Sequence, residues 1–203
     1  MHLVCLDLEG ILVPEFWVEI SKAVGVPELS RTTREEANFD KLMKSRLDIL
    51  EKNNLKLDDL KQAANLIEPV NGALDFVREL RQRTQLAILS DTFEQFTERF
   101  MELFSYPLLF ANVLQAAPDG SVIGYKLWQQ EGKEAAVKIF KSMNLKVFAA
   151  GGSFNNISML RTADSRCLFR APQMIRNKCP DIPCVDSFGE LSAKISRFLR
   201  QPG

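Results

Sequence analysis

The sequence predicts an α/β fold in which helices cover both faces of a mainly parallel sheet. Three observations favour this class. Short apolar runs alternate with amphipathic segments along most of the 203 residues, Gly, Pro or acidic residues punctuate them, and one long segment over 15–65 shows helical periodicity alone. Alternating strands and helices are typical of doubly wound sheets, which bind ligands beyond the carboxyl ends of their strands.

The first predicted strand lies within residues 3–8, an apolar run that places Asp7 at a loop before a turn at Gly10. A helix follows from Ala73, where apolar residues recur at helical spacing. A second buried strand is predicted over 86–90, which ends at a serine. Both of these predicted strands thus end in polar residues.

The remaining elements continue the alternation. They are a helix over 93–104, a hairpin of residues 110–114 and 122–127 around Pro118-Asp119-Gly120, a helix over 133–143, a strand over 146–150, a helix from Ile157, and short strands over 167–169 and 183–185.

The helical segment between the first two strands is expected to form a separate cap. Residues 13–70 make up this cap, and residues 1–12 and 71–203 make up the three-layer core. A strand contributed by the cap segment to the main sheet would contradict this division.

Composition argues against several classes of function. The 26 Lys and Arg balance 26 Asp and Glu, so the chain lacks the basic surplus of a nucleic-acid-binding protein. No apolar run is long enough to span a membrane, and the early carboxylate Asp7 does not suit a signal peptide, so we expect a cytoplasmic protein. The four cysteines form no C-x-x-C pair, and cysteine-bound metal is not expected.

Polar residues gather where the predicted strands end. Asp7 and Glu9 follow the first strand, Ser90 ends the second, and a Gly-rich turn over 151–156 follows a later one. Two carboxylates can supply a nucleophile and a general acid, while a serine hydroxyl and the lysine Lys133 can stabilise phosphoryl oxygens. Each signal is weak alone, since acidic residues two apart are also common at solvated strand ends.

Four segments together carry a resemblance to a known family. They are Asp7-Leu-Glu9-Gly10, Ile88-Leu-Ser90-Asp91-Thr92, Lys133, and Ala150-Gly151-Gly152-Ser153-Phe154-Asn155-Asn156. Their order and approximate spacing resemble the four motifs of the haloacid dehalogenase superfamily, and the match covers nearly the whole chain. Within that superfamily the sequence is most similar to the phosphoserine phosphatase branch, and there to the bacterial phosphoserine:homoserine phosphotransferases.

The resemblance implies magnesium-dependent phosphoryl transfer from phosphoserine, a small phosphorylated amino acid, to water or homoserine through an aspartyl-phosphate. Asp7 would attack the phosphoryl group, and Glu9 would protonate the leaving oxygen and later activate the acceptor. Ser90 would bind phosphoryl oxygens, and Lys133 would orient Asp7 and neutralise charge. The branch also suggests a homodimer.

The resemblance also implies residues that recognise the substrate. Glu15 would meet its ammonium group and Arg46 its carboxylate, while the motif positions Asp91, Thr92 and Asn155 would line the site. For Arg46 a surface charge on an amphipathic helix fits the periodicity equally well. If Arg46 lies in an open cleft, Arg46→Ala would weaken binding and leave stability nearly unchanged.

One motif departs from the family pattern. Where the family reads Gly-Asp-x-x-Asn-Asp, this chain has Gly152 and Asn156 at the two acidic positions. The implied Mg²⁺ ligands are then the Asp7 side chain, the Glu9 main-chain carbonyl and a neutral Asn156. The chain is either an enzyme with weakened metal binding or a pseudoenzyme that binds an amino-acid phosphate. We expect Gly152→Asp to raise magnesium affinity and turnover, opposed by strain if Gly152 has a positive φ.

Overall fold

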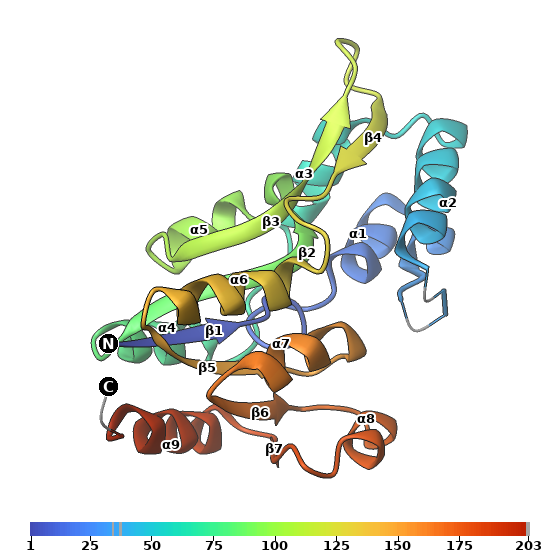
Figure 1. The fold of residues 1–203 in the computed structure, drawn as a ribbon. Coiled ribbons are helices and arrows are strands. Elements are labelled where there is room, and N and C mark those ends of the chain that lie inside the picture. Colours follow the sequence, from blue (N-terminus) through green and yellow to red (C-terminus); the bar gives the residue numbers. More distant parts are fainter. Residues whose placement is uncertain (34, 37, 202–203) are drawn as a thin grey trace.

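A seven-stranded sheet forms the centre of the computed structural model, which describes residues 1–33, 35–36 and 38–201. The strands are β1 (His2–Leu6), β2 (Gln85–Phe93), β3 (Leu108–Ala116), β4 (Val122–Lys126), β5 (Lys146–Gly151), β6 (Ser165–Phe169) and β7 (Cys184–Val185). Their order is β4-β3-β2-β1-β5-β6-β7, and only the β3–β4 pair is antiparallel (Figure 1). The predicted α/β fold and hairpin are confirmed.

Strand β1 lies in the middle of the sheet and aligns the ends of its neighbours. Leu6 pairs with Ile88 of β2 on one side and with Ala150 of β5 on the other. The Asp7 amide continues this register by donating to the Ala150 carbonyl at 3.1 Å. Residues just after these positions therefore meet at one edge of the sheet.

Helices cover both faces of the sheet, because successive strand residues point to opposite sides. Val4 and Leu6 pack in the apolar cluster with helices α4 (Ala73–Arg81), α5 (Glu98–Leu103) and α9 (Phe188–Leu199). Leu3 and Cys5 pack in the second cluster with helices α6 (Gly132–Ser142), α7 (Ile157–Thr162) and α8 (Gln173–Lys178). The result is the three-layer arrangement that the sequence predicts.

Local sequence fixes the ends of several helices. Helix α9 begins at a capping box, in which Ser187 and Glu190 exchange side-chain and main-chain hydrogen bonds. Helix α1 (Phe16–Val24) ends at Gly25, whose φ of 70° is the left-handed conformation that glycine adopts without strain.

The segment predicted as a cap is helical in its described part. It contains α1, the 3₁₀ turn η1 (Pro27–Ser30), α2 (Phe39–Lys52) and α3 (Leu57–Asn65), and none of its described residues joins the main sheet. The β3–β4 hairpin reaches toward α2, where the rings of Tyr125 and Phe39 lie 5.7 Å apart (Figure 1). The division into cap and core at these boundaries stays a prediction.

One element differs from its predicted extent. Strand β2 continues to Phe93, because a shift in register lets Phe93 pair with Asn112 of β3. The following segment starts with the 3₁₀ turn η2 (Glu94–Phe96), and α5 begins only at Glu98. Among the helices of the described chain, none is both long and apolar enough to cross a membrane.

Candidate active site

Asp7 lies directly after β1 at the edge where the parallel strands end. Its side chain is buried, and its residue is only 4% exposed. Oδ1 accepts a hydrogen bond from the Leu8 amide at 2.9 Å and lies 3.0 Å from Lys133 Nζ. Oδ2 accepts a 2.6 Å hydrogen bond from Asn156 Nδ2. Burial raises the pKa of Asp7, whereas Lys133 and Asn156 oppose this by stabilising the carboxylate.

Lys133 lies in the first turn of α6, next to the sheet edge. Its Nζ forms two ion pairs, 3.0 Å from Asp7 Oδ1 and 3.1 Å from Asp91 Oδ2. Burial alone would lower the pKa of Lys133, but the two carboxylates outweigh it and raise the pKa above its ordinary value. Lys133 is therefore a permanent cation at the centre of the site.

The residues after Ile88 line the side of the site next to Asp7. Ser90 is fully buried, and its Oγ accepts a hydrogen bond from the Thr92 amide at 3.2 Å. Thr92 Oγ1 is buried and has no hydrogen-bond partner among the described residues. Asn155 is exposed and donates through Nδ2 to Asp91 Oδ2, so the site reaches solvent at this pair.

Two glutamates, Glu9 and Glu15, lie close to each other beside Asp7. Glu9 Oε1 accepts a hydrogen bond from the Phe16 amide at 2.7 Å, at the start of α1. Burial, followed by the charge of Glu15, raises the pKa of Glu9 to about 8. The raised pKa favours the protonated form of Glu9, which lies within the electrostatic reach of Asp7 and Lys133.

Arg46 does not lie in an open cleft, and neither is it a surface charge; both expectations were wrong. The residue is 5% exposed, its guanidinium lies 4.4 Å from the Trp17 ring centroid, and Nη2 donates to the Arg31 carbonyl at 2.7 Å. Helical periodicity places Arg46 on α2 but does not show that Trp17 covers it. Burial lowers the pKa of Arg46 to about 10, against the opposing charges of Glu9 and Glu15.

Because Arg46 is packed, we expect Arg46→Ala to destabilise the fold, contrary to the expectation from sequence. The variant loses a cation–π contact and a charged hydrogen bond, which together suggest a loss of about 2 kcal/mol in the free energy of unfolding. Urea denaturation measures this value. Lys44→Ala, at an exposed position on the same helix, is the control. If Arg46→Ala were as stable as wild type, the buried Arg46 side chain would not contribute to the stability of the fold.

Asn156 is fully buried and its amide has a fixed orientation. Asn156 Oδ1 accepts a hydrogen bond from the Ser153 amide at 3.0 Å and lies 2.8 Å from Ser153 Oγ. Its NH₂ group therefore faces Asp7. Sequence reasoning missed the part played by Ser153, although the Ser-x-x-Asn spacing resembles a capping box and could have indicated it.

Gly152 has no room for the carboxylate that was expected to restore a metal ligand. A Cβ atom built at this position would lie 2.5 Å from the main-chain oxygen of Phe169, at the end of β6. The φ of Gly152 lies outside the left-handed region. The backbone strain that was expected from a positive φ is therefore not what opposes Gly152→Asp. A side chain is excluded here because the main chain of Phe169 lies too close, and main chain moves only at high cost.

The donor set does not match a carboxylate-rich Mg²⁺ site. Of the ligands implied by the resemblance, Asp7 and the Glu9 main-chain carbonyl remain, while Gly152 offers no side chain and Asn156 presents its NH₂ group. No group of three or more His, Cys, Asp or Glu residues that could hold a metal occurs in the described part of the chain. The residues present therefore do not fit the ion in the way the family motif implies.

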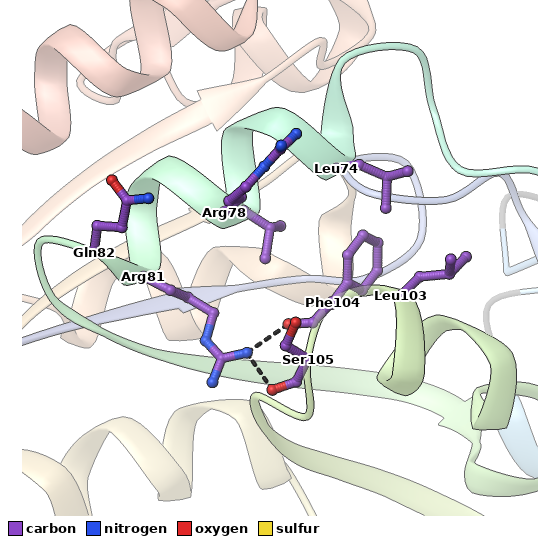
Figure 2. Close-up of a pocket in the computed structure, with 8 residues that line it drawn as sticks. Leu74, Arg78, Arg81, Gln82, Leu103, Phe104 and Ser105 are labelled. Atoms are coloured by element: carbon purple, nitrogen blue, oxygen red, sulfur yellow. Dashed lines mark hydrogen bonds between the residues drawn. The ribbon is translucent and has the colours of Figure 1, made fainter.

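A surface cavity lies at the opposite edge of the sheet. Figure 2 shows it between α4 and the turn before β3. Its volume is about 440 Å³. Arg81 closes one side by donating to the carbonyl oxygens of Phe104 and Ser105. Because these residues precede β2 and β3, whereas Asp7 follows β1, this cavity is separate from the strand-end site.

Relatives with known names match almost the whole chain. It is 40% identical over 191 residues to phosphoserine phosphatase ThrH of Pseudomonas aeruginosa, covering 94% of this chain and 93% of the relative. It is also 40% identical over 191 residues to a phosphoserine phosphatase of Pseudomonas syringae pv. tomato, covering 94% of this chain and 81% of the relative. No protein-family model matches the sequence.

Solved structures agree with these relatives. A phosphoserine phosphatase in its apo form has a TM-score of 0.75 at 25% identity, covering 92% of this chain and 94% of that one. A phospho-aspartyl intermediate analogue of phosphoserine phosphatase gives the same TM-score and identity, covering 92% and 93%. The alternative of a pseudoenzyme finds no support among these proteins, which are named as phosphatases.

Proposed function

The chain belongs to the phosphoserine phosphatase family of the haloacid dehalogenase superfamily, and on that premise we propose that it hydrolyses phosphoserine through an aspartyl-phosphate on Asp7. The observation that carries the proposal is the buried ion pair between Asp7 and Lys133, 3.0 Å apart at the strand-end edge. A buried carboxylate held by a lysine is a fixed nucleophile, and the same lysine can stabilise charge on a transferring phosphoryl group.

In the first step an Asp7 oxygen attacks phosphorus while the bond from phosphorus to the serine oxygen breaks. Glu9, whose raised pKa favours its protonated form, donates a proton to the leaving serine oxygen. In the second step the Glu9 carboxylate takes a proton from water, whose oxygen attacks phosphorus and releases phosphate and free Asp7. Ser90 and Lys133 would hold the phosphoryl oxygens throughout.

Glu15 and Arg46 would recognise the amino-acid part of the substrate. Both interact electrostatically with each other and with Glu9, so they lie beside the leaving-group side of the site. Arg46 Nε is buried and has no hydrogen-bond partner in the part of the chain that the structure describes. This N–H is a donor that a substrate carboxylate could satisfy.

Several finer assignments stay predictions. Homoserine as an acceptor would place its hydroxyl where the attacking water lies, and addition of homoserine to the assay tests this. Magnesium-dependent phosphate release and a homodimer follow from the family resemblance, and a cytoplasmic location follows from the composition of the sequence. No step above uses the ion, because Asp7 is the only side-chain carboxylate ligand that the motif retains.

We expect Glu9→Gln to lower phosphate release from O-phospho-L-serine by about 10²- to 10⁴-fold, because glutamine cannot donate an acidic proton to the leaving group. A phosphate assay measures this. Glu51→Gln, an exposed substitution on α2, is the control and should match wild type. Absence of phosphate release from wild type, with or without homoserine, would contradict the proposed function itself.

A further inference from the structure

Among the described residues, the polar contacts of the Asp7 carboxylate are with hydrogen-bond donors and one cation. Leu8 N and Lys133 Nζ lie at Oδ1, and Asn156 Nδ2 lies at Oδ2. A divalent cation binding at Oδ2 would have to approach beside an NH₂ group whose hydrogens carry partial positive charge. The structure therefore satisfies this carboxylate with its own side chains.

The amide of Asn156 cannot readily turn to offer its oxygen to a cation. Ser153 holds that oxygen through its main-chain amide at 3.0 Å, and its hydroxyl, which also contacts Asn155 Oδ1, lies 2.8 Å away. Rotation would break the hydrogen bond from the Ser153 amide inside a fully buried site and, without a cation between them, would place two oxygens, Asn156 Oδ1 and Asp7 Oδ2, against each other. The NH₂ group is thus the permanent partner of Asp7.

Lys133 already neutralises part of the negative charge around Asp7 without a metal ion. Lys133 carries one positive charge between the carboxylates of Asp7 and Asp91, which leaves a net charge of about −1 for these three groups. Relative to the family motif, Gly152 and Asn156 remove two negative charges, which equals the charge that one Mg²⁺ would neutralise. Loss of both carboxylates therefore leaves these groups with the same net charge that the family motif has when its ion is bound.

We propose that this chain binds its phosphorylated amino acid without a divalent cation, with Asn156 and Lys133 holding Asp7 in place of the metal. The inference rests on the proposed function for the identity of the ligand. It goes beyond that function by assigning to Asn156 the role of a positioning residue, fixed by Ser153, at a place where the family motif binds a metal.

Calorimetry of wild type with O-phospho-L-serine tests this directly. We expect the same dissociation constant in excess EDTA and in saturating MgCl₂, and no shift of the unfolding midpoint by MgCl₂ alone. Binding that appears only with MgCl₂, or binding in neither condition, would overturn the inference. Phosphate release is read separately: release that depends on MgCl₂ would leave the proposed function intact.

The variant Asn156→Asp should recreate a need for the cation. It places a second carboxylate at hydrogen-bond distance from Asp7, and their repulsion should weaken phosphoserine binding in EDTA by about tenfold or more. MgCl₂ should restore binding, because the ion can bridge the two carboxylates. Asn144→Asp adds the same charge before β5, at the opposite edge of the sheet, and should bind as wild type does.

An Asn156→Asp protein that binds equally well in EDTA and MgCl₂ would contradict the role of the amide. If this variant does not fold, the calorimetry of wild type in EDTA still decides the proposal.

Discussion

Replacement of Asp7 by asparagine is expected to lower phosphate release from O-phospho-L-serine by at least about 10³-fold, because an amide oxygen is not a competent nucleophile toward phosphorus. The substitution keeps the shape of the side chain, and the amide oxygen of the new side chain could still accept from Leu8 or Asn156. Lys133 also keeps its ion pair with Asp91 at 3.1 Å in this variant, so loss of activity should come with a folded protein.

A phosphate assay and the unfolding midpoint of Asp7→Asn are measured together. Asp48→Asn, which removes an exposed carboxylate of α2, is the matched control and should retain wild-type activity. If Asp7→Asn retained the wild-type rate, the nucleophile would be another group, and the scheme built on Asp7 would be wrong.

Lys133→Met should destabilise the fold more than Arg46→Ala does. Lys133 is buried, and its loss leaves Asp7 inside the protein without the cation that lies 3.0 Å away. Breaking a buried pair by removing one partner costs about 3–5 kcal/mol in the free energy of unfolding. Asp7 can take up a proton in response, which limits the loss and also removes the nucleophilic form.

Urea denaturation measures the effect against a matched control on the same helix. Lys138 pairs with Glu134 at 2.5 Å, but its side chain is 63% exposed, so Lys138→Met should cost about 0–1 kcal/mol. Equal losses in the two variants would show that the Lys133 pair is no more important than a surface pair.

Much of the fold could be predicted because its signals are local. The strands are apolar runs, and the helix from Ala73 buries Ala73, Phe76, Val77 and Leu80 as its spacing predicts. The meeting of Asp7 and Asn156 could also be predicted, since parallel strands bring their carboxyl ends to one edge. The place of Lys133 beside Asp7 came from the motif resemblance, because Lys133 opens a helix and does not end a parallel strand.

The errors concern contacts between segments far apart in the sequence. The burial of Arg46 depends on Trp17 from another helix, and periodicity within α2 contains no information about that neighbour. The close approach at Gly152 depends on the main chain of Phe169, which belongs to a different strand. Such contacts are set by tertiary packing, so a motif comparison describes Gly152 only as a missing ligand.

The central claim is that Asp7 receives the phosphoryl group, and acid quenching of the wild-type protein during turnover of O-phospho-L-serine tests it most directly. The account predicts that mass spectrometry of the digested protein finds one phosphoryl group on the peptide containing Asp7. This group should be absent from Asp7→Asn. It should be more abundant in Glu9→Gln if that substitution slows hydrolysis of the aspartyl-phosphate more than its formation. A phosphoryl group on another residue, or phosphate release with no adduct in any variant, would contradict it.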